Sequence, residues 1–362
     1  MTWLSQILQR AAHLTDVLGI RAPVLGAPMW GVTTPQLVAS VSEAGGLGVL
    51  PSGLLNGDAL CKAIADVKRL TNQPFAVDLR VPLREREIAA KTDQVFDALE
   101  PLRDELGAPQ EMPCIPDFDE QFEAILASDV PVVRFSFGGP REVYAEALEA
   151  RHIVMIGCVN STREAKVLRT AGCQVIVAQG VEAGGPRQFF ENPAEASQIG
   201  LMALLPPVVR VSGDASVVAS GAIMSARSML AAMMLGASGV EIGSLLVRTN
   251  ESAWPQAMKD QVPWCDDAAT RLTALTSGRM TRVVPTGLAD ALVDAGLEPA
   301  PYPGQLKALY TVDQAARRQA RLDLVEMPLG QAAQTAPTGS AQAVVERLIH
   351  EYEGMLGEIH AD

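Results

Sequence analysis

The chain has 362 residues, 48% of them hydrophobic, so it can bury a large core as one α/β barrel with an appendage or as two medium domains. Its 29 basic and 42 acidic residues give a formal net charge of −13, which repels nucleic-acid phosphates and anionic membranes. Nucleic acids and membranes are therefore not expected partners.

The cysteines are odd in number and never form a C-x-x-C pair: they are Cys61, Cys114, Cys158, Cys173 and Cys265. This pattern argues against a disulfide framework or a zinc site, so we expect no metal, and it fits a reducing cytoplasm. Residues 1–21 carry Arg10 and Asp16 among apolar side chains, which predicts an amphipathic helix rather than a signal peptide. The apolar stretch 229–247 is interrupted by glycines and Glu241, which predicts a buried helix leading into a strand rather than a membrane span.

Short apolar runs alternate with helical patterns along the chain, which is typical of a parallel sheet built from βα units. The predicted strands cover residues 24–27, 48–50, 75–79, 130–135, 153–158, 175–178, 217–219 and 239–242. Candidate helices between them include residues 35–44, 58–70, 141–150, 162–171 and 224–235. Because eight such repeats favour a closed barrel over an open sheet, the sequence predicts a (β/α)₈ TIM barrel with a smaller, mainly helical second domain.

Two segments depart from the repeat. Residues 80–129 are long and charged, and we interpret them as an extended βα connection. Residues 248–327 are polar and predict a helical subdomain on the substrate side. The expected domains are thus the barrel at 1–247, this subdomain, and a tail at 328–362 that ends in an amphipathic helix and returns to the barrel.

Ligands of such barrels bind at the carboxyl ends of the strands, and three of these ends are rich in glycine. They are residues 179–185 after the sixth strand, 220–223 after the seventh and 243–244 after the eighth. Backbone N–H groups of glycine-rich turns can closely approach an anion, so the three loops together favour a phosphate site. Each loop alone could equally be a tight βα turn. The chain contains neither a G-x-G-x-x-G after a strand nor a Walker motif.

A series of motifs over about residues 19–248 resembles the nitronate monooxygenase family, formerly called 2-nitropropane dioxygenases. In chain order these are Ala27-Pro-Met29, Phe75-Ala-Val-Asp78-Leu, Val130-Pro-Val-Val-Arg-Phe, Cys158-Val-Asn-Ser-Thr-Arg-Glu-Ala, Ala178-Gln-Gly-Val-Glu-Ala-Gly-Gly185, Ala219-Ser-Gly-Ala-Ile223 and Val240-Glu-Ile-Gly-Ser244. In the tail, Gly330-Gln331 looks like that family's C-terminal flavin contact. The same scaffold also serves flavin-dependent enoyl and quinone reductases.

The resemblance implies a barrel that holds FMN. It implies that Met29, otherwise a plausible core residue, packs by the isoalloxazine, and that Asp78 and Glu241 stand where the family commonly has Asn and Gln. Carried over in the same way, Gly221 and Ala222 would cradle the phosphate. The remaining cofactor positions would be Gln179, Gly180, Gly184, Gly243, Ser244 and Gln331.

One departure from the family bears on catalysis. In the family, a catalytic His that takes a proton from a neutral nitroalkane usually follows the Glu-Ala-Gly-Gly motif, and here that position is Pro186. Proline can neither accept nor relay a proton. His152, at the start of the fifth strand, is expected on the opposite face of the barrel. The catalytic residue is therefore unknown, although a nitronate is already deprotonated and can be oxidised without the base.

Three functions remain open at this stage. The first is an FMN-dependent nitronate monooxygenase that oxidises anionic alkyl nitronates with O₂, with Arg187 or the Phe189-Phe190 pair as candidate substrate contacts. In the alternative interpretation, the Arg187 side chain is solvated, and the Phe189 and Phe190 rings only pack against other side chains. The second function is an NAD(P)H-dependent flavin reductase of quinones or enoyl thioesters, and the third is a flavin-binding protein with little turnover. The sequence leaves the oligomeric state open, and a homodimer is among the options.

Overall fold

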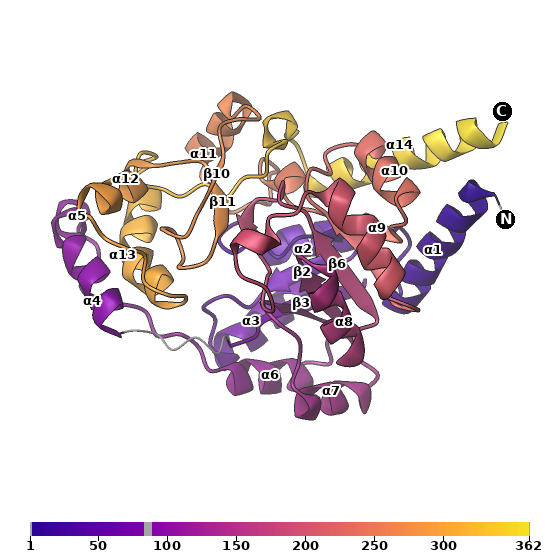
Figure 1. Cartoon of the computed structure of the whole chain (residues 1–362), viewed down its shortest axis with the longest axis horizontal. Coiled ribbons are helices and arrows are strands. Elements are labelled where there is room, and N and C mark those ends of the chain that lie inside the picture. The colour runs from indigo at the N-terminus through magenta and orange to yellow at the C-terminus, as the bar shows by residue number, and fades with distance from the viewer. Residues whose placement is uncertain (1, 83–88, 362) are drawn as a thin grey trace.

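The computed structural model describes residues 2–82 and 89–361, and its centre is a barrel of eight parallel strands (Figure 1). The strands are β1 (Val24–Gly26), β2 (Gly48–Pro51), β3 (Phe75–Arg80), β4 (Val132–Ser136), β5 (Val154–Val159), β6 (Val175–Gln179), β8 (Ser216–Ser220) and β9 (Gly239–Ile242). They are ordered β1-β9-β8-β6-β5-β4-β3-β2, and a parallel bridge between Leu25 and Leu47 brings β1 against β2. The predicted TIM barrel is confirmed.

Helices surround the barrel and also form a second layer. They are α1 (Trp3–Leu18), α2 (Pro35–Glu43), α3 (Gly57–Leu70), α4 (Ala89–Ala98), α5 (Glu100–Leu106), α6 (Phe118–Ala127), α7 (Glu142–Glu149), α8 (Thr162–Thr170), α9 (Leu201–Val211), α10 (Ala226–Met234), α11 (Gln256–Gln261), α12 (Gly287–Asp294), α13 (Gly304–Arg318) and α14 (Ala341–Ala361). Local chemistry sets several starts: the Thr34 hydroxyl accepts a hydrogen bond from Leu37 N, Pro35 opens α2, and Ser161 caps α8 in the same way.

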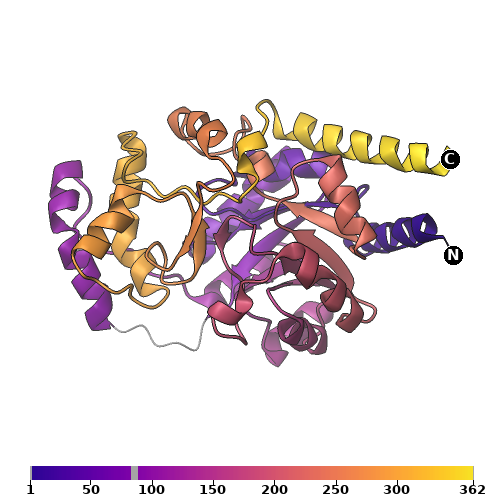
Figure 2. The same ribbon diagram turned by 45° about the horizontal axis from the view of Figure 1, so that its top comes forward.

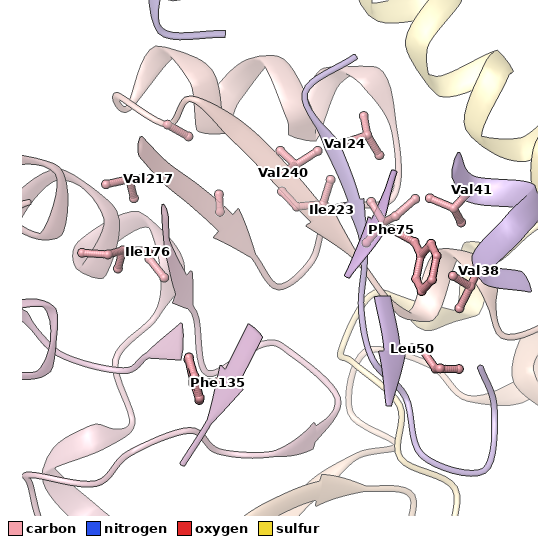
Figure 3. Close-up of a cluster of buried hydrophobic side chains, with 14 of the residues drawn as sticks. Val24, Val38, Val41, Leu50, Phe75, Phe135, Ile176, Val217, Ile223 and Val240 are labelled. Atoms are coloured by element: carbon pink, nitrogen blue, oxygen red, sulfur yellow. The ribbon is translucent and has the colours of Figure 1, made fainter. Parts of the chain in front are cut away.

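The main core lies between the strands and their helices. Figure 3 shows Val38 and Val41 of α2 beside Phe75 of β3, and all three side chains are at most 3% exposed. Most strands are buried along their whole length, as parallel strands covered on both faces must be. A further cluster, including Leu25 and Val177, fills the barrel interior.

A second hydrophobic cluster joins helices that are distant in sequence. It includes Val95 of α4, Leu106 of α5, Leu292 of α12 and Val312 of α13. Figures 1 and 2 show these four helices grouped at the end of the molecule away from both termini. Residues 80–129 are therefore more than a connection, because α4 and α5 pack on α13 while α6 packs on α3 of the barrel.

A small antiparallel sheet links this second cluster to the barrel. It contains β10 (Arg271–Thr273), β11 (Thr281–Val283) and β7 (Gly185–Pro186), which lies in the long loop after β6. The amphipathic helices expected at both ends are confirmed as α1 and α14, and Figure 2 shows them leaving the barrel on the same side. Within the described residues, no helix has the length and apolar character needed to cross a membrane.

Candidate functional site

A cavity opens at the carboxyl ends of the strands, between the barrel and the second helical layer. Its wall comes from the loops after β1, β6, β8 and β9, from β3 and β4, from α13, and from residues 326–333. The structure brings together in this wall nearly all the residues singled out from the sequence: Met29, Asp78, Gln179, Gly184, Pro186, Gly221, Ala222, Glu241, Gly243 and Ser244. Gly180 and Gln331 lie outside the lining; Gly180 N donates to Ser220 O, and Gln331 N donates to Glu182 O.

The loops after β8 and β9 present unpaired backbone donors to the cavity. Within the described part of the chain, the N–H groups of Gly221, Ala222, Gly243 and Ser244 donate no hydrogen bond to any protein atom. Gly221 and Ala222 have φ values of 120° and 53°, so the backbone turns sharply here. Several amides on one concave surface form a site suited to an anion.

The C-terminal tail closes over this end of the cavity. Gly330 N donates to Ser244 Oγ at 3.0 Å. A Cβ placed on Gly184 would lie only 2.6 Å from Gly330 N and from the Leu329 carbonyl carbon. Glycine at 184 therefore allows the loop after β6 and the tail to touch.

An ion cluster forms the floor of the cavity. Arg134 Nη1 lies 2.6 Å from Asp78 Oδ1, and Arg134 Nε lies 3.1 Å from Glu241 Oε2. Ser136 Oγ donates to the same Asp78 oxygen at 2.7 Å, and Ser220 Oγ donates to Glu241 Oε1 at 3.0 Å. The three charged side chains are only 3–4% exposed.

Arg134 is not among the site residues predicted from the sequence, whereas both acids are. Its signals were its place as the one arginine in the apolar run of the fourth predicted strand and in the motif Val130-Pro-Val-Val-Arg-Phe. Burial acts to lower the pKa of Arg134, but attraction by Glu241 and then by Asp78 outweighs burial, so its pKa is raised and the guanidinium stays charged. The acids at 78 and 241 are thus explained by a cation placed between them.

Gln179 and Pro186 meet at the edge of the cavity. Gln179 Nε2 donates to Pro186 O at 3.2 Å, while its Oε1 accepts from Asn160 Nδ2 at 3.1 Å and from Arg187 Nη1 at 2.8 Å. These bonds fix the orientation of the Gln179 amide. Pro186 is also held by β7, because it pairs with Thr281 of β11.

Arg187 is fully buried and lies outside the cavity lining, so both sequence interpretations of it, as a substrate contact and as a solvated residue, are wrong. Its Nη1 donates to Gly180 O at 2.6 Å, and its Nη2 donates to Ser197 O at 2.9 Å. Burial lowers its pKa to about 10. Arg187 therefore fastens the loop that carries Pro186. Phe189 packs under the Arg279 guanidinium, 4.5 Å away, rather than lining the cavity.

An aromatic wall, formed by Phe137 and Tyr302, lines another part of the cavity. Phe137, with φ of 68°, stacks edge-on against Tyr302, their centroids 5.4 Å apart. Gln188 Oε1 accepts from Phe137 N at 3.2 Å, and the Arg279 guanidinium lies 4.4 Å from the Phe137 ring centroid. Several contacts therefore hold this ring in an unusual backbone conformation next to the cavity.

Two acids from the second layer complete the wall. Asp313 Oδ2 pairs with Arg317 Nε at 2.7 Å, whereas Asp313 Oδ1 is buried with no hydrogen-bond partner among the described residues. Burial, reinforced by Asp313, raises the pKa of Glu326 well above its usual value. No histidine of the described residues lines the cavity, and His152 lies in an exposed turn before β5. No cluster of metal-binding side chains occurs in the part of the chain that was described.

Comparison with known proteins gives one consistent result. The sequence model described as nitronate monooxygenase matches residues 11–351. A probable nitronate monooxygenase of Staphylococcus saprophyticus is 31% identical over 95% of this chain and 98% of its own. A probable nitronate monooxygenase of Staphylococcus aureus is 32% identical over 94% of this chain and 96% of its own.

Solved structures agree with the sequence matches. A nitroalkane oxidase from Streptomyces ansochromogenes superposes with a TM-score of 0.85 at 30% identity, covering 96% of this chain and 99% of that one. FabK from Thermotoga maritima gives a TM-score of 0.75 at 26% identity, covering 96% and 98%. On these matches and on its barrel, the chain belongs to the nitronate monooxygenase family and is an oxidoreductase.

Proposed function

We propose that this oxidoreductase is an FMN-dependent nitronate monooxygenase that oxidises anionic alkyl nitronates with O₂. The observation that carries the cofactor assignment is the set of four unpaired amides at Gly221, Ala222, Gly243 and Ser244, residues that all line one cavity. A phosphate dianion supplies the acceptors that these donors need, and barrel enzymes commonly bind phosphate after the seventh and eighth strands. Family membership supports the flavin and the substrate class.

The residues present also fit a flat polar ring beyond the phosphate. Met29 offers an apolar surface, while Gln179 and the floor cluster offer donors and acceptors. In the described part of the chain nothing donates a hydrogen bond to Asp78 Oδ2, so this oxygen can accept one from an N–H of the ring. Arg134 and Ser136 hold the carboxylate in place for that contact.

A bound flavin would supply the one-electron redox chemistry that couples nitronate oxidation to O₂. The protein orients the two partners and keeps water away through the aromatic wall of Phe137 and Tyr302. It supplies no base at Pro186, which has no ionisable group. A nitronate needs no deprotonation, so the expected substrate is the anion rather than the neutral nitroalkane.

Two measurements test the proposal. Purified protein should show the absorbance of oxidised flavin and consume O₂ with ethyl nitronate; a folded protein that rejects added FMN would refute it. Anaerobic bleaching of the flavin by NADH, without O₂ uptake on nitronate, would favour the reductase alternative instead.

The variant Pro186→His tests the missing base. Its imidazole should raise kcat/KM for neutral nitroethane by about 100-fold, the lower range for a positioned general base, while kcat/KM for ethyl nitronate changes little. Pro186→Ala is the matched control, since it also restores a backbone N–H but adds no base. Equal gains in both variants, or none in either, would argue against the assignment of this position.

A further inference from the structure

We propose that Arg80 binds the anionic group of the substrate and so sets the preference of this enzyme for anions. The inference rests on the proposed function for the identity of that substrate. Three cationic residues line the cavity among those described: Arg80, Arg134 and Arg317. Only one of them is available to a ligand.

The other two arginines are committed within the protein. Arg134 pairs with both Asp78 and Glu241 in the floor. Arg317 pairs with Asp313, and its Nη2 donates to Glu326 O at 2.9 Å. Arg80 forms no ion pair or hydrogen bond with any residue that the structure describes.

The strand register places Arg80 above the floor. Asp78 pairs with Arg134, and Arg80 pairs with Ser136, on neighbouring strands β3 and β4. Side chains two residues apart on a strand point to the same face, about 7 Å from each other. Arg80 therefore lies beyond Asp78, nearer the carboxyl end of β3, and both side chains line the cavity.

Arg80 lies over the ring of Trp30. Its guanidinium carbon lies 5.9 Å from the centroid of the Trp30 ring. The ring in turn lies against Gly53, where a Cβ would overlap it. A guanidinium over a ring face keeps the N–H groups at its edge, which match the two oxygens of a nitronate or carboxylate head group.

The charges of the other lining residues determine how strongly Arg80 attracts an anionic substrate. Asp313 and Glu326 also line the cavity, where Asp313 is paired with Arg317, and the whole chain carries a formal charge of −13. Among the described lining residues, Arg80 is the one cation not paired with a carboxylate, so the charge of an anionic substrate is best neutralised there. The neutral aromatic wall offers no competing partner.

The test uses a ligand that binds without reacting. Propionate carries the same planar, two-oxygen anionic head as a nitronate, and propionamide is its neutral counterpart. Each is titrated into the flavin-loaded protein, with dissociation constants taken from the flavin absorbance. The wild type should prefer propionate by about tenfold or more, as for one charge-assisted contact. No such preference in the wild type would overturn the proposal.

The variants separate charge from packing. Arg80→Met should abolish the preference, with Arg80→Gln as a second neutral variant if Met lowers the yield. Arg80→Lys should keep the preference to within about threefold, because the charge remains. Arg141→Met is the matched control, since Arg141 stacks on Tyr144 at 4.8 Å and lies outside the cavity lining. An unchanged preference in Arg80→Met, or an equal loss in Arg80→Lys, would overturn the proposal.

The experiments distinguish a wrong assignment of Arg80 from a wrong proposed function. Propionate binding needs no turnover, so a preference lost in Arg80→Met supports the anion site even if ethyl nitronate is not oxidised. If the wild type oxidises ethyl nitronate, Arg80→Met should raise KM about tenfold at similar kcat. Oxidation with an unchanged KM would refute Arg80 while leaving the proposed function intact.

Discussion

Replacing Arg134 with methionine should strongly destabilise the protein. The change keeps a long side chain but leaves Asp78 and Glu241 as buried carboxylates without a cation, each only 3% exposed. Removing one partner from a buried ion pair costs about 3 to 5 kcal/mol. At about 2.1 cal/mol/K of unfolding entropy per residue, a chain of 362 residues then loses about 4 to 7 °C in Tm.

The assay is thermal unfolding of the flavin-free protein, followed by circular dichroism. The control is the triple variant Arg134→Met, Asp78→Asn, Glu241→Gln, which removes all three charges at similar volume. It should recover most of the lost Tm, since the cost comes from uncompensated charge and not from the missing arginine itself. A single variant as stable as the wild type, or a triple variant no better than the single, would refute the ion cluster as described.

Further predictions concern the tail contact and the acidic wall. Gly184→Ala should push the loop after β6 away from Gly330 and lower the affinity for FMN by about tenfold or more, measured by fluorescence titration, whereas Gly354→Ala, with open space around it, should not. An unchanged FMN affinity in Gly184→Ala would contradict this prediction, because it would show that the tail moves to make room for the methyl group. Because the folded-state pKa of Glu326 is raised, folding binds a proton and stability falls as pH rises through the window above the ordinary Glu pKa. Glu326→Gln should therefore raise Tm at pH 8 but scarcely at pH 4; the opposite pH dependence would contradict this.

The barrel and most of the cavity wall were predictable from local sequence patterns. The hydrophobic periods of strands and helices, and capping residues such as Thr34 and Ser161, are local signals in the sequence. The structure contains the helices that these caps predict. Glycine-rich strand ends identified the loops with free amides because one edge of a parallel barrel collects every carboxyl end. Motif resemblance added Met29, Asp78 and Gln179, which all line the cavity.

The pairing of buried charges could not be predicted before the fold was known. Arg134 and Glu241 are 107 residues apart, and nothing local indicates that β4 and β9 point them at each other across the barrel. The same holds for α4 and α5, which leave the barrel to pack on α13 about 200 residues later. Arg187 can be buried because its guanidinium donates hydrogen bonds to backbone carbonyl oxygens. Arg80 stays available to a ligand because no carboxylate of the described residues pairs with it. Burial and pairing of charge depend on the summed surroundings of a side chain, and those surroundings exist only after the chain has folded.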